Sequence, residues 1–267
     1  MKEPYPSHRP VSPVKPAAPY IGGKRNLARR LVSLIEKTPH RTYAEPFVGM
    51  GGVFLRRRRQ PPAEVINDWS RDVATFYRVL QRHYAAFLDM LRFQITSRAE
   101  FERLVAVDAD TLTDLERAAR FLYLQRTAFG GKVAGRNFGV SHHRPGRLDM
   151  MRLGETLQEL HERLSGVIIE RLDFEAFMAR YDTAETLFYL DPPYHGGEGD
   201  YGPGLFARED FERLVVALAR LKGRFILSIN DVPAMREAFG RFAIEGVETN
   251  YSLQGGGKPA RELIVTG

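Results

Sequence analysis

Hydrophobic residues recur at helical spacing in the first third of the chain. Leu27, Leu31, Leu34 and Ile35 lie on one face of a predicted helix, and a second helical pattern covers residues 73–91. Between them lie a short apolar stretch broken by a glycine-rich turn, at 41–55, and a short predicted strand at 64–66. An order of strand, turn, helix, strand and helix is typical of an α/β fold with a parallel sheet.

The same alternation returns in the last third of the chain. Residues 167–174 and 186–194 are predicted strands, followed by a helix at 208–221, a strand at 224–231 and a short helix at 232–239. Residues 241–251 and 262–267 are predicted to close the sheet as antiparallel strands. The sequence therefore predicts a mixed sheet with helices on both faces.

The middle of the chain has a different pattern. It contains helical stretches at 98–107, 113–127 and 152–164, and residues 128–147 between the last two are rich in Gly, Arg, Lys and His without periodicity. Six of the sixteen prolines fall within the first nineteen residues, which predicts an extended, poorly ordered arm. We expect a flexible N-terminal arm at 1–18, a main domain at 19–94 and 167–267, and an inserted domain at 95–166.

Composition narrows the classes of function. The chain has 267 residues and a formal charge of +6, which modestly favours a polyanionic partner. The absence of cysteine excludes disulfides, thiolate zinc sites, zinc-dependent base deaminases and cysteine nucleophiles. No apolar run is long enough to span a bilayer, and the N-terminus lacks the apolar core of a signal peptide. We expect a soluble, cytoplasmic protein without a metal or membrane partner, and expect it to be a monomer.

The sharpest chemical signal is Asp191-Pro192-Pro193-Tyr194, directly after a predicted strand. Two prolines fix φ and remove two N–H donors, so the Pro192 carbonyl can join the Asp191 carboxylate as a second acceptor beside the Tyr194 ring. Such a group suits an exocyclic amine on a flat ring, held so that its nitrogen lone pair can attack an electrophile. The alternative is an ordinary proline-rich turn.

Two further motifs accompany it. The glycine-rich turn within residues 45–52 lets a ligand approach the backbone closely, and Asp68 at the end of the next strand can accept hydrogen bonds from a ribose diol. Taken alone, Asp68 is better explained as part of a helix N-cap with Ser70. Tyr20-Ile21-Gly22-Gly23-Lys24 opens a helix, where Lys24 could meet a ligand carboxylate or serve as a basic cap.

In chain order, the three motifs are Tyr20–Lys24 (the first motif), the glycine-rich turn within residues 45–52, and Asp191–Tyr194. In this order they resemble the DNA adenine-N6 methyltransferases of the Dam-like D12 class, especially compact phage and prophage members. The resemblance runs from about Pro19 to the C-terminus. It implies a Rossmann-like, S-adenosylmethionine-dependent methyltransferase core with a mixed seven-stranded sheet and an inserted, mainly helical target-recognition lobe. It also implies a site-specific enzyme that acts on double-stranded DNA and transfers a methyl group to the N6 amine of a flipped adenine.

The resemblance also assigns residues. It implies catalytic roles for Asp191, Pro192, Pro193 and Tyr194, and Arg126 lies in a segment that resembles the family's recognition segment. In the basic loop that follows, we expect DNA contacts from Lys132, Arg136 and Asn137. The resemblance implies cofactor contacts from Tyr20, Gly22, Lys24, Glu45, Pro46, Phe47, Gly49, Gly51, Asp68, Asp173, Phe174 and Asp191. Two positions depart from the family pattern: Tyr20 stands where Trp is usual, and Ala128-Phe129-Gly130 replaces Gly-Phe-Asn. Because the second departure lies in the target-recognition lobe, the DNA target sequences known for the family are not assigned to this chain.

Three alternatives remain open. Cytosine-N4 methylation uses the same amine chemistry but more often has Ser in place of Asp191, and glutamine methylation usually has Asn there. The third is a DNA-binding module that has lost catalysis. Carbon-5 cytosine methylation needs a thiolate nucleophile and is excluded.

Alternatives to DNA binding also remain open for the basic residues. A solvated loop would equally explain Lys132, Arg136, Arg144 and Arg147, and a solvated helix end would explain Arg56–Arg59.

Overall fold

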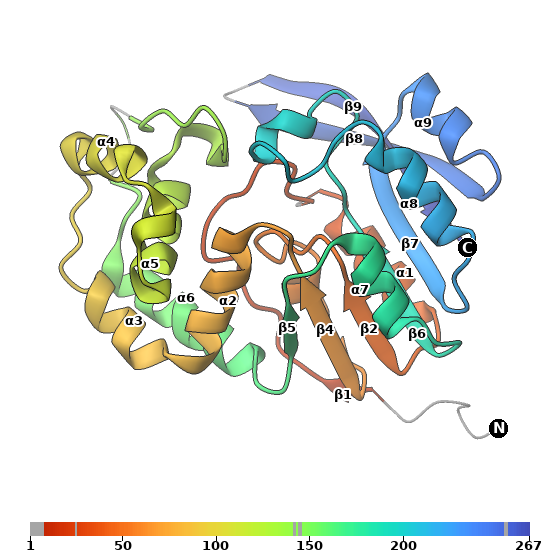
Figure 1. Ribbon diagram of the computed structural model, residues 1–267, viewed down its shortest axis with the longest axis horizontal. Coiled ribbons are helices and arrows are strands. Elements are labelled where there is room, and N and C mark those ends of the chain that lie inside the picture. The colour runs from red at the N-terminus through yellow and green to blue at the C-terminus, as the bar shows by residue number, and fades with distance from the viewer. Residues whose placement is uncertain (1–7, 25, 141–142, 144–145, 254–255) are drawn as a thin grey trace.

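The computed structural model describes residues 8–24, 26–140, 143, 146–253 and 256–267 (Figure 1). Its seven-stranded sheet has the order β5-β4-β2-β6-β7-β9-β8, with β9 antiparallel to both neighbours and the other pairs parallel. The predicted Rossmann-like α/β fold is confirmed. The strands are β2 (Thr42–Glu45), β4 (Ala63–Asn67), β5 (Ile168–Glu170), β6 (Thr186–Leu190), β7 (Arg224–Asn230), β8 (Ala243–Leu253) and β9 (Gly256–Thr266).

The strands β2 and β6 are neighbours at the centre of the sheet, although their starts at Thr42 and Thr186 are 144 positions apart in the sequence. From β2 the chain builds outward through β4 to β5, and from β6 it builds the other way through β7. The strand order therefore reverses between β2 and β6. In an open α/β sheet, the carboxyl ends of the strands at such a reversal form the crevice that binds ligands.

Helices cover both faces of the sheet, as predicted. Alternate residues of β6 enter two separate cores: Leu187 and Tyr189 pack with α1, while Phe188 and Leu190 pack with α7 and α8. Because β6 is buried on both faces, its sequence reads as continuously apolar rather than alternating. The helices of these layers are α1 (Ala28–Lys37), α2 (Arg71–Arg82), α7 (Phe174–Tyr181), α8 (Asp210–Leu218) and α9 (Pro233–Ala238).

The middle of the chain forms a group of helices at one side of the sheet, on the left of Figure 1. They are α3 (Tyr84–Leu91), α4 (Arg98–Ala106), α5 (Asp114–Thr127) and α6 (Met150–Arg163), with short 3₁₀ turns η2 (Ala109–Thr111) and η3 (Phe129–Gly131). Phe76 of α2 packs against Phe87 of α3 and Phe121 of α5, with ring centroids 6.1 and 6.0 Å apart. The lobe therefore shares one continuous core with the sheet.

Several predicted elements are shorter than expected, and the structure shows the cause of two of these differences. The single helix expected at 73–91 is broken at His83 into α2 and α3, and the break turns Phe87 toward Phe76. The strand expected at 167–174 ends at Glu170. Beyond it, the Asn67 side chain replaces the strand pairing by accepting a hydrogen bond from Leu172 N (2.7 Å) and donating one to Leu172 O (3.0 Å).

The N-terminal segment also differs from expectation in its described part. Residues 8–18 are extended, as the prolines require, but they are packed against the domain rather than free of it. The strand β1 (Arg9–Pro10) pairs with β3 (Arg59–Gln60), and Val14 N donates to Leu55 O (2.9 Å). Ala17 is fully buried. Small apolar side chains let this proline-rich segment lie close to the core. Residues 1–7 lie outside the described part.

Arg57 is fully buried, so the expectation of a solvated Arg56–Arg59 helix end is wrong at that residue. Its guanidinium pairs with Glu64 of β4 and lies 3.6 Å from the centroid of the Tyr43 ring. Arg163 of α6 makes two hydrogen bonds to the same Glu64 carboxylate, at 2.6 and 2.8 Å. Arg57 itself directly follows the short turn η1 (Phe54–Arg56). One buried carboxylate, that of Glu64, therefore joins α6, the last helix of the lobe, to this part of the sheet.

Replacing Glu64 with Gln should destabilise the protein by about 3–5 kcal/mol, because two buried arginines lose their counter-charge. Burial alone would raise the pKa of Glu64, but Arg57 and Arg163 outweigh it and hold the pKa below its usual value. This stabilisation is present above the unfolded pKa and is lost as pH falls through the lower folded pKa. Urea unfolding across acid pH measures both effects.

The matched control is Glu102→Gln, because the Glu102 side chain is exposed and makes only a long ion pair with Arg98 at 4.0 Å. It should change the free energy of unfolding by less than about 0.5 kcal/mol. Equal unfolding midpoints for the two variants would contradict a structural role for the buried Glu64 pairs.

Candidate active site

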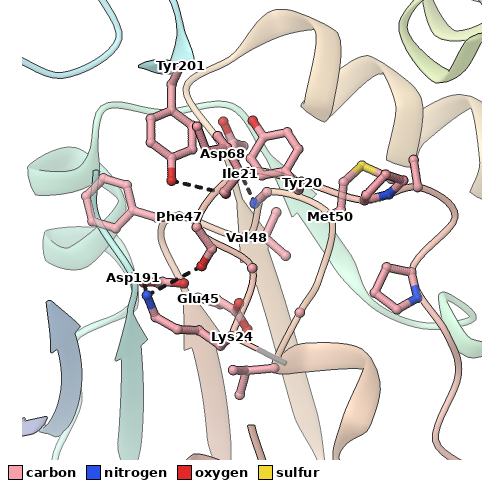
Figure 2. A pocket seen from close by; sticks show the side chains of 18 of the residues that line it. Tyr20, Ile21, Lys24, Glu45, Phe47, Val48, Met50, Asp68, Asp191 and Tyr201 are labelled. Atoms are coloured by element: carbon pink, nitrogen blue, oxygen red, sulfur yellow. Dashed lines mark hydrogen bonds and ion pairs between the residues drawn. The ribbon is translucent and has the colours of Figure 1, made fainter. Parts of the chain in front are cut away.

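A pocket of about 660 Å³ lies at the carboxyl ends of β2, β4 and β6, where the strand order reverses (Figure 2). One side is formed by the segment from Lys15 to Lys24, and another by the turn after β2. Nine residues assigned to catalysis or to the cofactor from the sequence line it: Tyr20, Gly22, Lys24, Glu45, Phe47, Gly49, Asp68, Asp191 and Pro193. The pocket is thus built from several segments that lie far apart in the sequence.

The centre of polar contacts is the Lys24 ammonium, which is buried just before α1. Its Nζ lies 2.7 Å from Asp191 Oδ1 and 3.6 Å from Glu262 Oε2, and it donates to the Tyr194 hydroxyl. It also lies 4.1 Å from the centroid of the Tyr194 ring. Lys24 therefore connects the first motif to both chemical groups of the Asp191–Tyr194 motif, rather than capping α1.

Asp191 follows β6 directly and faces the pocket with 21% of its side chain exposed. Ser228 donates to Asp191 Oδ1 at 3.3 Å, and the Ser228 hydroxyl in turn lies 2.8 Å from the Tyr189 hydroxyl. Burial raises the pKa of Asp191 to about 6, although the ion pair with Lys24 works in the opposite direction. At neutral pH the carboxylate is therefore largely ionised and can accept hydrogen bonds.

The turn after β2 is held by Asp68 at the end of β4. The two Asp68 oxygens accept from Gly49 N and Ser70 N, both at 2.9 Å. Ser70, not Asp68, is the N-cap of α2. Gly49 has φ of +50°, and a Cβ there would lie 3.0 Å from the Tyr20 ring. Glycine at this position therefore lets the Tyr20 ring lie directly against the turn.

Burial raises the pKa of both acidic groups at these strand ends. The pKa of Asp68 is raised to about 6, and its two backbone hydrogen bonds oppose the shift. Burial raises the pKa of Glu45 to about 8, opposed by a hydrogen bond in which the Tyr43 hydroxyl donates to Glu45 at 2.6 Å. At neutral pH Glu45 is mostly protonated, so it enters the pocket as a neutral group.

Aromatic side chains cover another side of the pocket. Phe47 contacts Phe174 and Phe206 with ring centroids 5.7 and 5.9 Å apart, and Phe47 and Phe206 line the pocket. Phe174 lies behind them, outside the pocket lining. Asp173 also lies outside it: it is the N-cap of α7 and pairs with Arg213 at 3.0 Å. The predicted cofactor roles of Asp173 and Phe174 stay predictions.

The remaining predicted residues support the lining from behind. Pro46 O accepts from Asn67 Nδ2 at 2.9 Å, and Gly51 has φ of +73°, with no room for a Cβ beside Leu55. Pro192 is buried, and Tyr194 contacts Lys24 without itself lining the pocket. These residues hold the backbone of the two turns in place.

The predicted DNA-binding residues have different environments. Arg126 lines the pocket and donates to Ala17 O (2.6 Å) and Arg147 O (2.8 Å), so its guanidinium already holds two backbone segments together. Arg136 is half-buried near Tyr20 and donates to Gln125 Oε1 at 3.5 Å. Lys132 and Asn137 are exposed. Arg144 lies outside the described residues, whereas Arg147 lies within them and is exposed.

Four polar residues near the pocket were not predicted from the sequence: Gln125, Ser228, Asn230 and Glu262. Gln125 is fully buried and donates from Nε2 to Pro19 O (2.9 Å) and Gly131 O (2.6 Å), which joins α5 to the first motif. The available signal was a polar residue inside an apolar run, as with Ser228 between Leu227 and Ile229 and with Glu262 before Leu263.

Neither a membrane span nor a metal cluster is found in the described residues. None of the helices there is long and apolar enough to cross a membrane. A group of three or more His, Asp or Glu side chains arranged to hold a metal ion is likewise not found there.

Comparison with known proteins gives one consistent result. Residues 20–253 match the model of the family described as D12 class N6 adenine-specific DNA methyltransferase. A type II methyltransferase of Paramecium bursaria Chlorella virus NC1A, M.CviBI, is 23% identical over 90% of this chain and 92% of its own length. M1.LlaDCHI of Lactococcus lactis subsp. cremoris, also a type II methyltransferase, is 28% identical over 95% of both chains.

A phage protein is similar over most of this chain as well. The DNA N-6-adenine-methyltransferase of Escherichia phage P1 is 28% identical over 85% of this chain but only 32% of its own length. The match thus extends across both the sheet and the inserted lobe.

Proposed function

Because the chain belongs to the D12 class of N6 adenine-specific DNA methyltransferases, we propose that its pocket binds S-adenosylmethionine and methylates the N6 amine of an adenine flipped out of double-stranded DNA. The observation that carries the proposal is the cluster of Asp191, Tyr194 and Lys24 at the carboxyl end of β6. It lies where the sheet reverses its strand order, beside the glycine-rich turn and Asp68.

The residues present fit this cofactor. Asp68 offers carboxylate oxygens at the end of β4, where a ribose diol can donate to them, and Phe47 and Phe206 offer apolar faces to a flat adenine ring. Tyr20 and the backbone of the Gly49 turn form a further side of the pocket, next to Asp68. When bound, S-adenosylmethionine supplies an electrophilic methyl group on a positively charged sulfur.

The chain itself orients the acceptor amine. A duplex hides the adenine amine, so the base must leave the stack before it can enter the site. Tyr194 then stacks on the adenine while Asp191 and the Pro192 carbonyl accept hydrogen bonds from the two N6 hydrogens. This arrangement turns the nitrogen lone pair out of conjugation with the ring. Asp191 acts as an acceptor and orienting group, and no covalent enzyme intermediate is required.

The inserted lobe supports the DNA-binding part of the proposal. Lys132 and Asn137 are exposed in the loop after α5, and Arg136 lies behind them next to Tyr20. We propose that Lys132 contacts a phosphate and that Asn137 is available to a base edge. Because Gln125 joins this loop to Pro19, the DNA-reading surface and the pocket are mechanically connected.

Replacing Asp191 with Asn should reduce methyl transfer by at least about a hundredfold while the protein stays folded, because the neutral amide loses the ion pair with Lys24 and is a weaker acceptor for the amine hydrogens. For the wild type, the rate should rise with pH through about 6, since the carboxylate accepts hydrogen bonds only when ionised. Labelled methyl groups are measured in DNA digested to nucleosides, which separates N6-methyladenine from N4-methylcytosine.

The control for this variant is Asp89→Asn, on the exposed side of α3, which should keep wild-type turnover. Near-normal methylation by Asp191→Asn would rule out the proposed role of the carboxylate, and labelled cytosine would rule out the proposed substrate.

Replacing Gly49 with Ala should weaken cofactor binding by about tenfold or more, because the new Cβ collides with the Tyr20 ring. Trp69 is the one tryptophan of the chain and lines the pocket with 40% of its surface exposed. Its fluorescence should therefore change in a saturable way as S-adenosylhomocysteine is added. Gly166→Ala is the matched control, since it carries the same positive-φ strain with open space around its Cβ. Equal affinities for the two variants would contradict the proposed pocket.

Replacing Lys132 with Gln should lower the slope of log K for DNA binding against log salt by about 1, the value expected for one lost phosphate contact. Lys222→Gln is the control, because Lys222 is exposed at the opposite end of the sheet, before β7. The measurement is DNA affinity at several salt concentrations. A slope that Lys132→Gln leaves unchanged would place the DNA phosphates elsewhere.

A further inference from the structure

Polar residues on one face of β7 and β9 surround the loop that carries the Asp191–Tyr194 motif. Ser228 donates to Asp191, and Asn230 binds both backbone groups of His195, accepting from its N–H and donating to its carbonyl, each at 3.0 Å. Glu262 of β9 lies directly opposite Asn230 in the strand register. Because opposed residues of an antiparallel pair point to the same face, Glu262 shares this face with Ser228 and Asn230.

Glu262 is a charged residue at a position that normally holds an apolar one. It is only 1% exposed and is followed by the buried residues Leu263, Ile264 and Val265. A carboxylate in such a place costs several kcal/mol unless a cation compensates it. The compensating cation is the Lys24 ammonium, 3.6 Å away, which also lies 2.7 Å from Asp191.

Lys24 is therefore shared between two carboxylates on different strands. Asp191 attracts the ammonium from the end of β6, and Glu262 attracts it from β9. With Glu262 present, Lys24 is held in the position from which it donates to the Tyr194 hydroxyl. The Tyr194 hydroxyl also makes a hydrogen bond with Glu262 itself, so without Glu262 both Lys24 and Tyr194 would lose a partner on the β9 side.

We propose that Glu262 is a positioning residue of the methyl-transfer site, which acts through Lys24 to fix the relative placement of Asp191 and Tyr194. The proposal deepens the proposed function and rests on it. Glu262 lies beyond residues 20–253, the part of the chain that matches the family model, so the family match assigns it no role.

The charge of Glu262 affects the pKa of Asp191, a quantity that would stay unchanged if Glu262 acted only through packing. Asp191 is faced by Lys24, by Glu45 of β2, by Ser228 of β7, by Glu262 of β9 and by the hydroxyls of Tyr189, Tyr194 and Tyr201. Among these, the charge of Glu262 raises the pKa of Asp191, whereas Lys24 lowers it. Removing the Glu262 charge should therefore move the pKa of Asp191 below about 6.

The experiment compares Glu262→Gln, Glu262→Asp and the control Glu248→Gln, which alters an exposed glutamate on the neighbouring strand β8. Single-turnover methylation of adenine-containing DNA is measured between about pH 5 and pH 9 at saturating cofactor. The pKa of Asp191 is measured independently of activity by carbon-13 NMR of the carboxyl group. Thermal unfolding of each variant reports stability.

For Glu262→Gln we expect the plateau rate to fall about tenfold, with the acid limb and the NMR pKa of Asp191 both shifted to lower pH. For Glu262→Asp, which keeps the charge but shortens the side chain, we expect a reduced plateau with an acid limb near that of wild type. Glu248→Gln should match wild type in all three measurements.

Two results would overturn the proposal: a Glu262→Gln plateau within about twofold of wild type, or a reduced plateau with an unchanged Asp191 pKa. The second pattern would show a role in packing alone. If Glu262→Gln does not fold, a wild-type plateau for Glu262→Asp overturns the proposal in the same way. Failure of the wild type and Glu248→Gln to methylate adenine would instead contradict the proposed function.

Discussion

The buried ammonium of Lys24 is the interaction on which the active site depends. A cation that is 2% exposed is stable only with counter-charges around it, and these come from the end of β6 and from β9. The segment before α1, the Asp191–Tyr194 loop and the last strand of the chain must therefore meet at one point. The strand order makes this possible, because it places β6, β7 and β9 next to one another beside the central strand β2.

The inserted lobe is attached to the sheet by a second set of buried polar contacts. Glu64 of β4 binds both Arg57 and Arg163, so it joins the beginning of the sheet to the last helix of the lobe. At the other end of the lobe, Gln125 joins α5 to Pro19, and Ile21 N donates to Gly131 O at 3.1 Å. The lobe is therefore held at both ends, and one of these attachments is to the segment that opens the pocket.

The chemistry of the pocket agrees with transfer to an amine. The reaction needs an oriented nitrogen and no protein nucleophile, which fits a chain without cysteine. It also needs acceptors that remain available at neutral pH. Burial raises the pKa of Asp191 only to about 6, so that group stays largely ionised, whereas Glu45, with a pKa of about 8, is mostly neutral. Two buried carboxyl groups near each other thus have different charge states, set by their partners.

The sequence by itself determined the α/β class, the closing antiparallel strands and the three motifs, because periodicity and local turn chemistry are properties of neighbouring residues. It did not reveal that residues 8–18 pack on the domain, that Arg57 is buried, or that Gln125 contacts Pro19 and Glu262 contacts Lys24. A buried Arg57 has the same local pattern as an exposed one, and the apolar residues after Glu262 do not reveal which cation it meets. The partners of these two residues, Glu64 and Lys24, come from other segments. Only the tertiary structure brings these charges together, and burial away from water then makes each depend on the other.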